Sequence, residues 1–187
     1  MQTTHALKEW QVAVDALEKG ETVMLLRKGG IREAGGRFSV VHDRVLLYPT
    51  YEHQQPHLLK ANYASQVKPV DSGWHPDLIR IGSWADVTDT IQVSAGDRVA
   101  ALMPFHIWNE TFIQERLKWK PHQPLYILLL RIYKLNSPQW IPYNSAYGGC
   151  KSWIDLTDAI ALEGTPVLSD SDYHQMTAAI HTIGTEC

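Results

Sequence analysis

Cysteine is scarce in this chain, and long apolar runs are absent. Cys150 and Cys187 are the two cysteines, too few for a disulfide framework or a four-cysteine metal site, and such scarcity is typical of a reducing compartment. No stretch approaches the roughly 18 apolar residues that a membrane-spanning helix needs. Residues 1–5 have neither the basic nor the apolar part of a secretory signal. The sequence therefore predicts a cytoplasmic protein without a membrane partner.

Complete catalytic signatures are absent as well. The pair Gly29-Gly30 is not followed by the Lys-Ser/Thr step of a P-loop. Residues 29–33 begin like a Nudix box but lack the paired glutamates downstream that would hold a metal. A restriction-type nuclease needs an acid-x-lysine step to hold Mg²⁺, and none follows Asp77. These absences favour a binding protein over a nuclease, imply no cofactor, and leave open whether the chain is an enzyme.

The composition that remains is that of an ordinary globular domain. Hydrophobic residues make up 44% of the chain and charged residues 20%, which is close to soluble averages. A chain of 187 residues can bury enough surface for one core, and no linker or repeat divides it, so residues 1–187 are predicted to form a single domain. The net charge of -3 argues against a strongly basic nucleic-acid binder but leaves room for a local basic patch.

A helix is expected near each end of the chain, docked on the core. Leu7, Trp10, Val14 and Leu17 recur at helical spacing, which predicts a helix that stops at Gly20.

The C-terminal segment repeats this design. Ser169 is predicted to cap a helix that carries an apolar stripe over residues 173–183 and ends at Gly184. Residues 94–102 and 109–118 are predicted to form two short helices in the middle of the chain, opened by the potential caps Ser94 and Asn109.

Strand-like runs fill most of the remaining sequence. They cover residues 22–26, 37–41, 44–48, 78–81, 85–93 and 125–133. The runs 37–41 and 44–48 flank His42-Asp43 and predict a hairpin, and the run 125–133 is the predicted central strand. Because strands and helices mix without regular alternation, we expect an α+β fold with a mixed, mostly antiparallel sheet or a small barrel flanked by helices.

A basic glycine turn follows the first strand-like run. Its cations Arg27, Lys28 and Arg32 surround Gly29 and Gly30. Charged side chains and backbone amides at such a turn can hold a phosphate. A solvated basic hairpin without a ligand is the structural alternative.

A group of polar side chains follows the run 44–48. The group comprises Tyr48, Thr50, Tyr51, Glu52, His53 and Gln54. We expect it to contact a base or another ligand. His53 beside Glu52 would be the general base of an enzyme, although neighbours on a strand point to opposite faces. His53 and His57 have the spacing of a helical metal pair, but Pro56 lies between them, so no metal site is predicted.

Two further segments combine aromatic and cationic residues. Residues 106–120 include Trp108 and alternate aromatic rings with cations, a pattern typical of surfaces that stack bases, while core packing is the structural alternative. In residues 147–153, Lys151 and Ser152 are predicted to contact a phosphate and Trp153 a base or ligand. A nucleophilic role for Cys150 lacks a histidine partner that sequence can place.

Residues 27–31, 48–54, 124–133 and 147–153 together resemble an uncharacterised bacterial family, frequent in cyanobacteria, that is labelled domain of unknown function 1802. The resemblance covers nearly the whole chain. That family has no established activity and sometimes occurs beside a restriction-endonuclease-type domain, which implies a link to DNA restriction and a nuclease partner. The order of elements is also similar, more loosely, to the PUA and ASCH barrels, which bind RNA or modified bases in a cleft.

Three hypotheses follow from these observations. The leading one is a nucleic-acid-binding module that reads modified or single-stranded bases, with cations on phosphates and Tyr51, His53, Gln54 and Trp108 on a base. The first alternative is an enzyme or phosphate-ligand protein that uses the turn 27–33 with Glu52 and His53. The second is a scaffold without a ligand. The site hypotheses require that the turn 27–33, residues 48–54 and residues 147–153 line one cleft.

Overall fold

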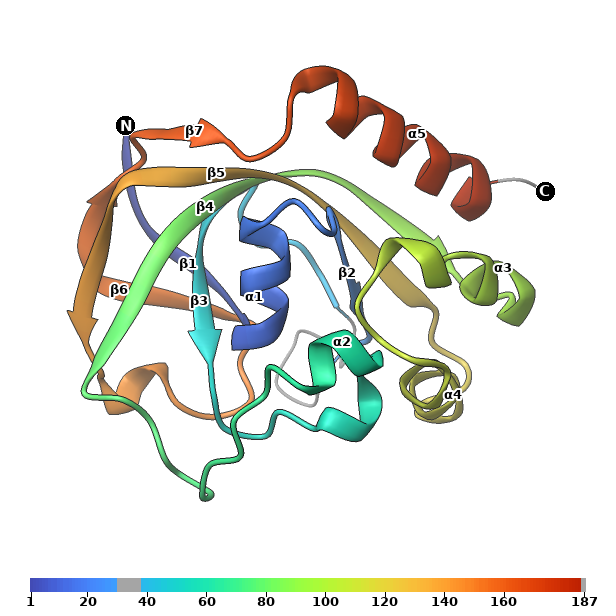
Figure 1. Ribbon diagram of the computed structural model, residues 1–187, viewed down its shortest axis with the longest axis horizontal. Helices are drawn as coiled ribbons and strands as arrows, with labels where there is room; N and C mark the ends of the chain where they lie inside the picture. Colours follow the sequence, from blue (N-terminus) through green and yellow to red (C-terminus); the bar gives the residue numbers. More distant parts are fainter. Residues whose placement is uncertain (30–37, 186–187) are drawn as a thin grey trace.

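A curved seven-stranded sheet forms the frame of the protein (Figure 1). The computed structural model describes residues 1–29 and 38–185. The strand order is β2-β5-β4-β3-β1-β6, and β7 pairs with β5 outside this path. The strands are β1 (Gln2–Trp10), β2 (Met24–Arg27), β3 (Arg44–Thr50), β4 (Leu78–Val93), β5 (Leu125–Pro142), β6 (Trp153–Ala161) and β7 (Gly164–Pro166). Only β1 and β3 pair in parallel among the described residues, so the predicted α+β fold with a mostly antiparallel sheet is confirmed.

The helices cover the sheet from both sides. They are α1 (Gln11–Glu18), α2 (Ala61–Ala64), α3 (Gly96–Ala101), α4 (Glu110–Lys118) and α5 (Asp170–Thr185). Helix α1 lies in the concave side of the curved sheet, whereas α5 lies outside it along β4 and β5 (Figure 1). Among the described residues, no helix is long and apolar enough to span a membrane.

The predicted N-terminal helix is half wrong. Residues 2–10 form strand β1, and the helix begins only at Gln11. The helical spacing of Leu7, Val14 and Leu17 predicted one helical face. All three side chains are buried, but Leu7 belongs to the strand. Residues 6–9 are buried without interruption, as expected of a strand that is covered on both faces rather than of an amphipathic helix.

The strands of the middle of the chain are fewer and longer than predicted. Residues 38–43 do not pair as a strand, so the predicted hairpin does not form, and β3 pairs with β1 and β4 instead. The two runs 78–81 and 85–93 form one strand, β4, with register shifts at Ile81/Ser83 and Val87/Asp89. Strand β5 continues past Pro138. A proline has no amide hydrogen to donate to a neighbouring strand, and Pro138 lies between Lys134 and Gln139, which are successive partners of β4.

The caps of two helices agree with the sequence, whereas Ser94 does not cap α3, whose N-cap residue is Ala95. The Asn109 side chain accepts a hydrogen bond from the Phe112 amide at the start of α4, and the Ser169 hydroxyl accepts one from the Asp172 amide at the start of α5. Helix α5 continues through the buried Gly184 rather than stopping there. Strands β6 and β7 were missed by sequence reasoning.

The buried histidine His106 makes the stability of the fold depend on pH. Its side chain is 3% exposed, its Nδ1 accepts a hydrogen bond from the Trp108 amide, and burial lowers its pKa to about 4, with the nearby Lys60 charge acting in the same direction. The unfolded chain, in which this pKa is about 6.5, therefore binds more protons than the folded chain between these two values.

We expect the free energy of unfolding to fall by about 3 kcal/mol from this group as the pH drops from 7 to 4. The measurement is denaturant unfolding at a series of pH values for the wild type and for His106→Asn, whose amide oxygen can still accept from the Trp108 amide. The variant should lose less stability over this window than the wild type. Parallel pH profiles would show that His106 is not the titrating group.

Candidate functional site

The three segments singled out in the sequence meet in one cavity of about 480 Å³. Arg27 and Lys28 line it from the end of β2, residues 48–53 line it from the end of β3, and residues 147–152 line it from the loop before β6. The condition that the site hypotheses required is therefore met by the described part of each segment. Gly30, Arg32 and Glu33 lie outside the described residues.

The parallel pairing of β1 and β3 brings these segments together. Strand β1 ends at Trp10 and β3 at Thr50, and these two residues are register partners. Since the carboxyl ends of parallel strands meet at one edge of a sheet, the residues that follow each strand face the same opening. The third segment is tied to the same edge by the Lys8 amide, which donates to the Ser152 carbonyl at 2.8 Å.

Lys8 is the central cation of the cavity wall, and no sequence pattern singled it out. Its ammonium donates to the Tyr147 carbonyl at 2.6 Å and to the Gly149 carbonyl at 2.8 Å. The side chain is buried, and burial lowers the pKa of the ammonium below its ordinary value. Lys8 thus holds the loop 147–149 in place while it keeps a positive charge beside the cavity.

The two cations predicted to hold phosphate are bound internally. Arg27 donates to the Lys8 carbonyl at 2.7 Å and lies 3.1 Å from the Glu9 carboxylate. Lys28 donates to the carbonyls of Arg116 and Leu117, near the end of α4, where the helix dipole favours a cation. Both side chains line the cavity, but neither charge is free of protein partners.

A row of aromatic rings lines the other wall and ends at Arg116. Trp10 meets Trp108 edge-to-face with 5.1 Å between ring centroids, and Trp108 stacks on Phe112 at 4.3 Å. The Arg116 guanidinium lies over the Phe112 ring at 4.9 Å. Burial lowers the pKa of Arg116, but a guanidinium stays charged at neutral pH. No ion pair of Arg116 is recorded within residues 1–29 and 38–185.

Glu52 and His53 form a fixed pair at the rim. The His53 Nε2 atom lies 3.1 Å from the Glu52 carboxylate, because the backbone turns here, with a positive φ of 66° at His53, instead of continuing as a strand. The expectation that the two side chains point apart is therefore wrong. The Glu52 carboxylate also accepts from the Gly73 amide at 2.7 Å, which lowers the pKa of Glu52, so its main contact orders the loop at residues 72–73.

Several sequence-predicted site residues lie outside the cavity wall. Gln54 accepts from the Val12 amide and thereby caps α1. Trp153 stacks on Phe38 and donates to the Ser39 carbonyl. The Gly29 carbonyl accepts from the Lys120 ammonium. Each of these groups has a structural partner.

The cavity wall contains three buried polar atoms that lack a hydrogen-bond partner among the described residues. They are Arg27 Nε, Tyr48 Oη and Trp108 Nε1. Burial also raises the pKa of Tyr48, so its hydroxyl stays protonated and able to donate. An unpaired buried donor costs about 1–3 kcal/mol. Three such donors in one wall are a reason to look for a ligand rich in hydrogen-bond acceptors.

Sequence reasoning missed several further residues that line the cavity, and five polar or aromatic ones matter most for the site. They are Lys8, Glu9, Trp10, Trp74 and Tyr143. The first three were assigned to a helix, and no alternation of polar and apolar residues over residues 2–10 marks them as part of a strand. Trp74 and Tyr143 lie in loops whose position depends on the two long strands β4 and β5, and no local pattern marks them.

The fold and the cavity define an α+β protein with a mostly antiparallel sheet and a cationic, aromatic cavity at the edge where β1 and β3 end. The chain belongs to the family described as domain of unknown function (DUF1802), whose profile matches residues 6–179. No curated protein matches the chain.

Solved structures similar to this chain come from the ASCH protein of Zymomonas mobilis. One has 11% sequence identity, a TM-score of 0.48 and coverage of 94% of both chains. A point mutant of ZmASCH has 12% identity, the same TM-score, and coverage of 83% of this chain and 91% of the other. The ASCH group is the one that the order of elements indicated.

The contacts of Lys8 predict a loosened cavity wall when its ammonium is removed. We expect Lys8→Met to leave the Tyr147 and Gly149 carbonyls without their donor and to speed tryptic cleavage after the exposed Lys151 by about tenfold, equivalent to about 1.4 kcal/mol of local opening. The measurement is cleavage at this peptide bond followed by mass spectrometry. Lys134→Met, which changes an exposed lysine outside the cavity, is the control. Equal cleavage rates in all three proteins would contradict the role of Lys8.

Proposed function

We propose that the cavity binds a single nucleotide unit of a nucleic-acid strand, with the base among the aromatic rings and its phosphates near the cations. The protein would be a reader of single-stranded or extruded bases rather than an enzyme that cuts the strand. The main support for this proposal is that a row of aromatic rings and a surplus of positive charge line the same cavity.

The charge of the cavity opposes that of the whole chain. Five cationic side chains, Lys8, Arg27, Lys28, Arg116 and Lys151, and two carboxylates, Glu9 and Glu52, line it, which leaves a surplus of three positive charges. The chain as a whole carries -3. A cleft lined by one sign of charge focuses the field and raises the local concentration of the opposite ion. An anionic ligand is therefore favoured over a neutral or cationic one.

The aromatic rings favour a planar ligand. Besides the row Trp10, Trp108 and Phe112, the rim carries Trp74, which meets Tyr51 edge-to-face at 5.9 Å. Tyr143 stacks with His75 at the same rim. Each base stacked on an aromatic side chain contributes about 1–3 kcal/mol. An anion with a planar aromatic part and several acceptors is a nucleotide.

The unpaired donors in the wall support a base edge rather than an aliphatic group. Trp108 Nε1 and Arg27 Nε can only donate, and base carbonyls and ring nitrogens are acceptors. These atoms are shielded from solvent in the unliganded protein, so a ligand would reach them only with a small movement of the wall. Pairing them would offset the cost of their burial.

A strand of nucleic acid is favoured over a free nucleotide by the cations and rings that continue outside the cavity. Arg116 lies 6.0 Å from the Trp119 ring, and the Lys120 ammonium lies 4.7 Å from the same ring. Trp119 is exposed. Alternating rings and cations next to a base pocket are what a flanking nucleotide would contact.

In a DNA restriction system, the role of this chain would be to recognise the base and not to cut the strand. No acid-x-lysine step occurs anywhere in the sequence, so the metal-holding step of a restriction nuclease has no counterpart here. In such a system a separate nuclease partner would cut, and this chain would select the base.

Binding of single-stranded DNA and RNA oligonucleotides in rising salt tests the proposal. We expect Trp74→Ala to weaken binding by about 5–150-fold through lost stacking. Lys151→Ala should weaken binding of all sequences and reduce the slope of log affinity against log salt by about 0.7, because one phosphate contact is lost. Fluorescence anisotropy on labelled strands gives both quantities.

Two matched variants separate the cavity from the general surface. Trp140 is 59% exposed and Lys134 is exposed, and neither lines the cavity. Trp140→Ala and Lys134→Ala should bind as the wild type does. Absence of binding at low salt, or equal losses in the control variants, would overturn the proposal.

Mononucleotides distinguish the small-molecule alternative. A nucleotide or phosphate ester that is the true ligand should stabilise the protein by about 2.7 kcal/mol at 100 times its Kd. If a free nucleotide does so and no oligonucleotide binds more tightly, the cavity serves a small ligand. In that case the pair Glu52 and His53 at the rim is the first place to look for chemistry.

A further inference from the structure

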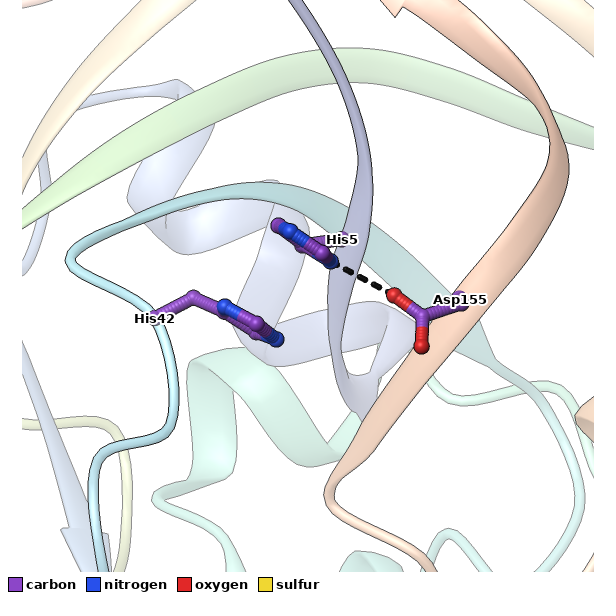
Figure 2. Close-up of side chains that lie close together, drawn as sticks. All are labelled: His5, His42 and Asp155. Atoms are coloured by element: carbon purple, nitrogen blue, oxygen red, sulfur yellow. Dashed lines mark hydrogen bonds and ion pairs between the residues drawn. The ribbon is translucent and has the colours of Figure 1, made fainter.

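Two histidines and an aspartate form a cluster outside the cavity wall (Figure 2). His5 belongs to β1, Asp155 to β6, and His42 to the segment before β3. The His5 Nδ1 atom lies 2.5 Å from the Asp155 carboxylate. The rings of His5 and His42 are stacked, with 3.5 Å between centroids and 5° between planes. One ligand atom of each residue lies within 4.8 Å of the other two.

The sheet itself assembles two of the three ligands. His5 and Asp155 are register partners of the antiparallel pair β1 and β6, so their side chains emerge on the same face. A register shift between Thr3 and His5 interrupts the pairing of β1 with β6 just before His5 and Asp155. The His5 amide donates a hydrogen bond to the Thr3 hydroxyl instead. Such irregularities re-aim a side chain relative to a regular strand. The third ligand comes from the next segment along the sheet, since β3 is the other neighbour of β1.

The three side chains of the cluster are of types that bind cations. The Asp155 carboxylate holds His5 by a hydrogen bond. Neutral imidazole and carboxylate are the states in which these groups bind metals.

We propose that His5, His42 and Asp155 form a binding site for a divalent transition-metal ion of the Zn²⁺ class. Two imidazole nitrogens and one carboxylate oxygen are ligands of Zn²⁺, Co²⁺ and Ni²⁺ rather than of Mg²⁺ or Ca²⁺, which prefer oxygen. Three protein ligands leave one position of a tetrahedral ion for water. The site does not depend on the proposed nucleic-acid function.

Metal binding requires a small rearrangement that the fold permits. At metal–ligand distances of about 2.0–2.2 Å, the ligand atoms of a tetrahedral site are about 3.4 Å apart. His5 and Asp155 would therefore move apart slightly, with the metal replacing the hydrogen bond between them. Because a metal must lie near the plane of each imidazole ring, the parallel stack has to open. His42 is the residue to turn, because it lies outside the strands whereas His5 and Asp155 are fixed by β1 and β6.

The bound ion would act on structure rather than on the reaction of a substrate. It would tie the segment before β3 to β1 and β6, three parts of the chain that already meet around Trp153, which stacks on Phe38 and donates to the Ser39 carbonyl. The three ligands come from positions 5, 42 and 155, so the ion would close two long loops. Binding to the folded chain alone raises its stability.

Titration of tag-free, chelator-treated protein with Co²⁺ tests the site. The expected result is the intense visible absorption of a four-coordinate Co²⁺ complex with one ion per chain, removed by added Zn²⁺. His42→Ala and Asp155→Asn should each weaken Co²⁺ binding by at least about tenfold, because each removes or weakens one ligand. Circular dichroism of each variant shows whether it is folded.

The control is a carboxylate–histidine pair elsewhere on the surface. His181 lies 3.2 Å from Asp89 and belongs to no three-ligand group among the described residues. His181→Ala should keep the Co²⁺ spectrum and affinity of the wild type. If wild-type protein gives no spectrum at millimolar Co²⁺, or if His42→Ala and Asp155→Asn bind as tightly as the wild type, the proposal is wrong.

Discussion

The parallel pairing of β1 and β3 is the constraint on which the cavity depends. Among residues 1–29 and 38–185 it is the one parallel pair in an otherwise antiparallel sheet, and it places the ends of both strands at one edge. The polar residues after Thr50 thus lie beside Lys8 and Glu9, and the Lys8 ammonium then fixes the loop 147–149 against the same edge. An antiparallel partner for β1 at this position would have sent residues 48–53 to the opposite end of the sheet.

The kinds of partner that the cavity cations have explain why the cavity keeps a net positive charge. Lys8 and Lys28 are paired with backbone carbonyls, and Arg116 lies on an aromatic face. Carbonyl dipoles and ring quadrupoles stabilise a cation without cancelling its charge. Of the cavity cations in the described part of the chain, Arg27 alone has a carboxylate partner, that of the buried Glu9. Had each cation been paired with an acid, the wall would be neutral and an anionic ligand would gain nothing by entering it.

Local patterns in the sequence predicted the elements that depend on neighbours along the chain. The caps Asn109 and Ser169 and the α+β class are of this kind. The helical prediction for residues 7–10 failed because Leu7 and Trp10 have a helical spacing, whereas on the strand that they form they point to opposite faces. Strand β6 was missed because its alternation of apolar and polar residues is short. Ile154 and Leu156 are buried, but the next buried residue is Ile160. Lys8 was missed because a lysine is usually solvated, and its partner carbonyls are 139 and 141 residues away.

The cavity and the histidine cluster share strand β1, and His5 of the cluster points to the face opposite Lys8 of the cavity. His5 and Lys8 are three residues apart, and between them the ladder is regular on the β6 side. Side chains at odd separations along a strand point to opposite faces. An ion held by His5 would therefore change neither the charge nor the shape of the wall around Lys8 directly. Any influence of the metal on the cavity has to pass through the backbone of β1 and the segment that leads into β3, which makes the two sites separable by single substitutions.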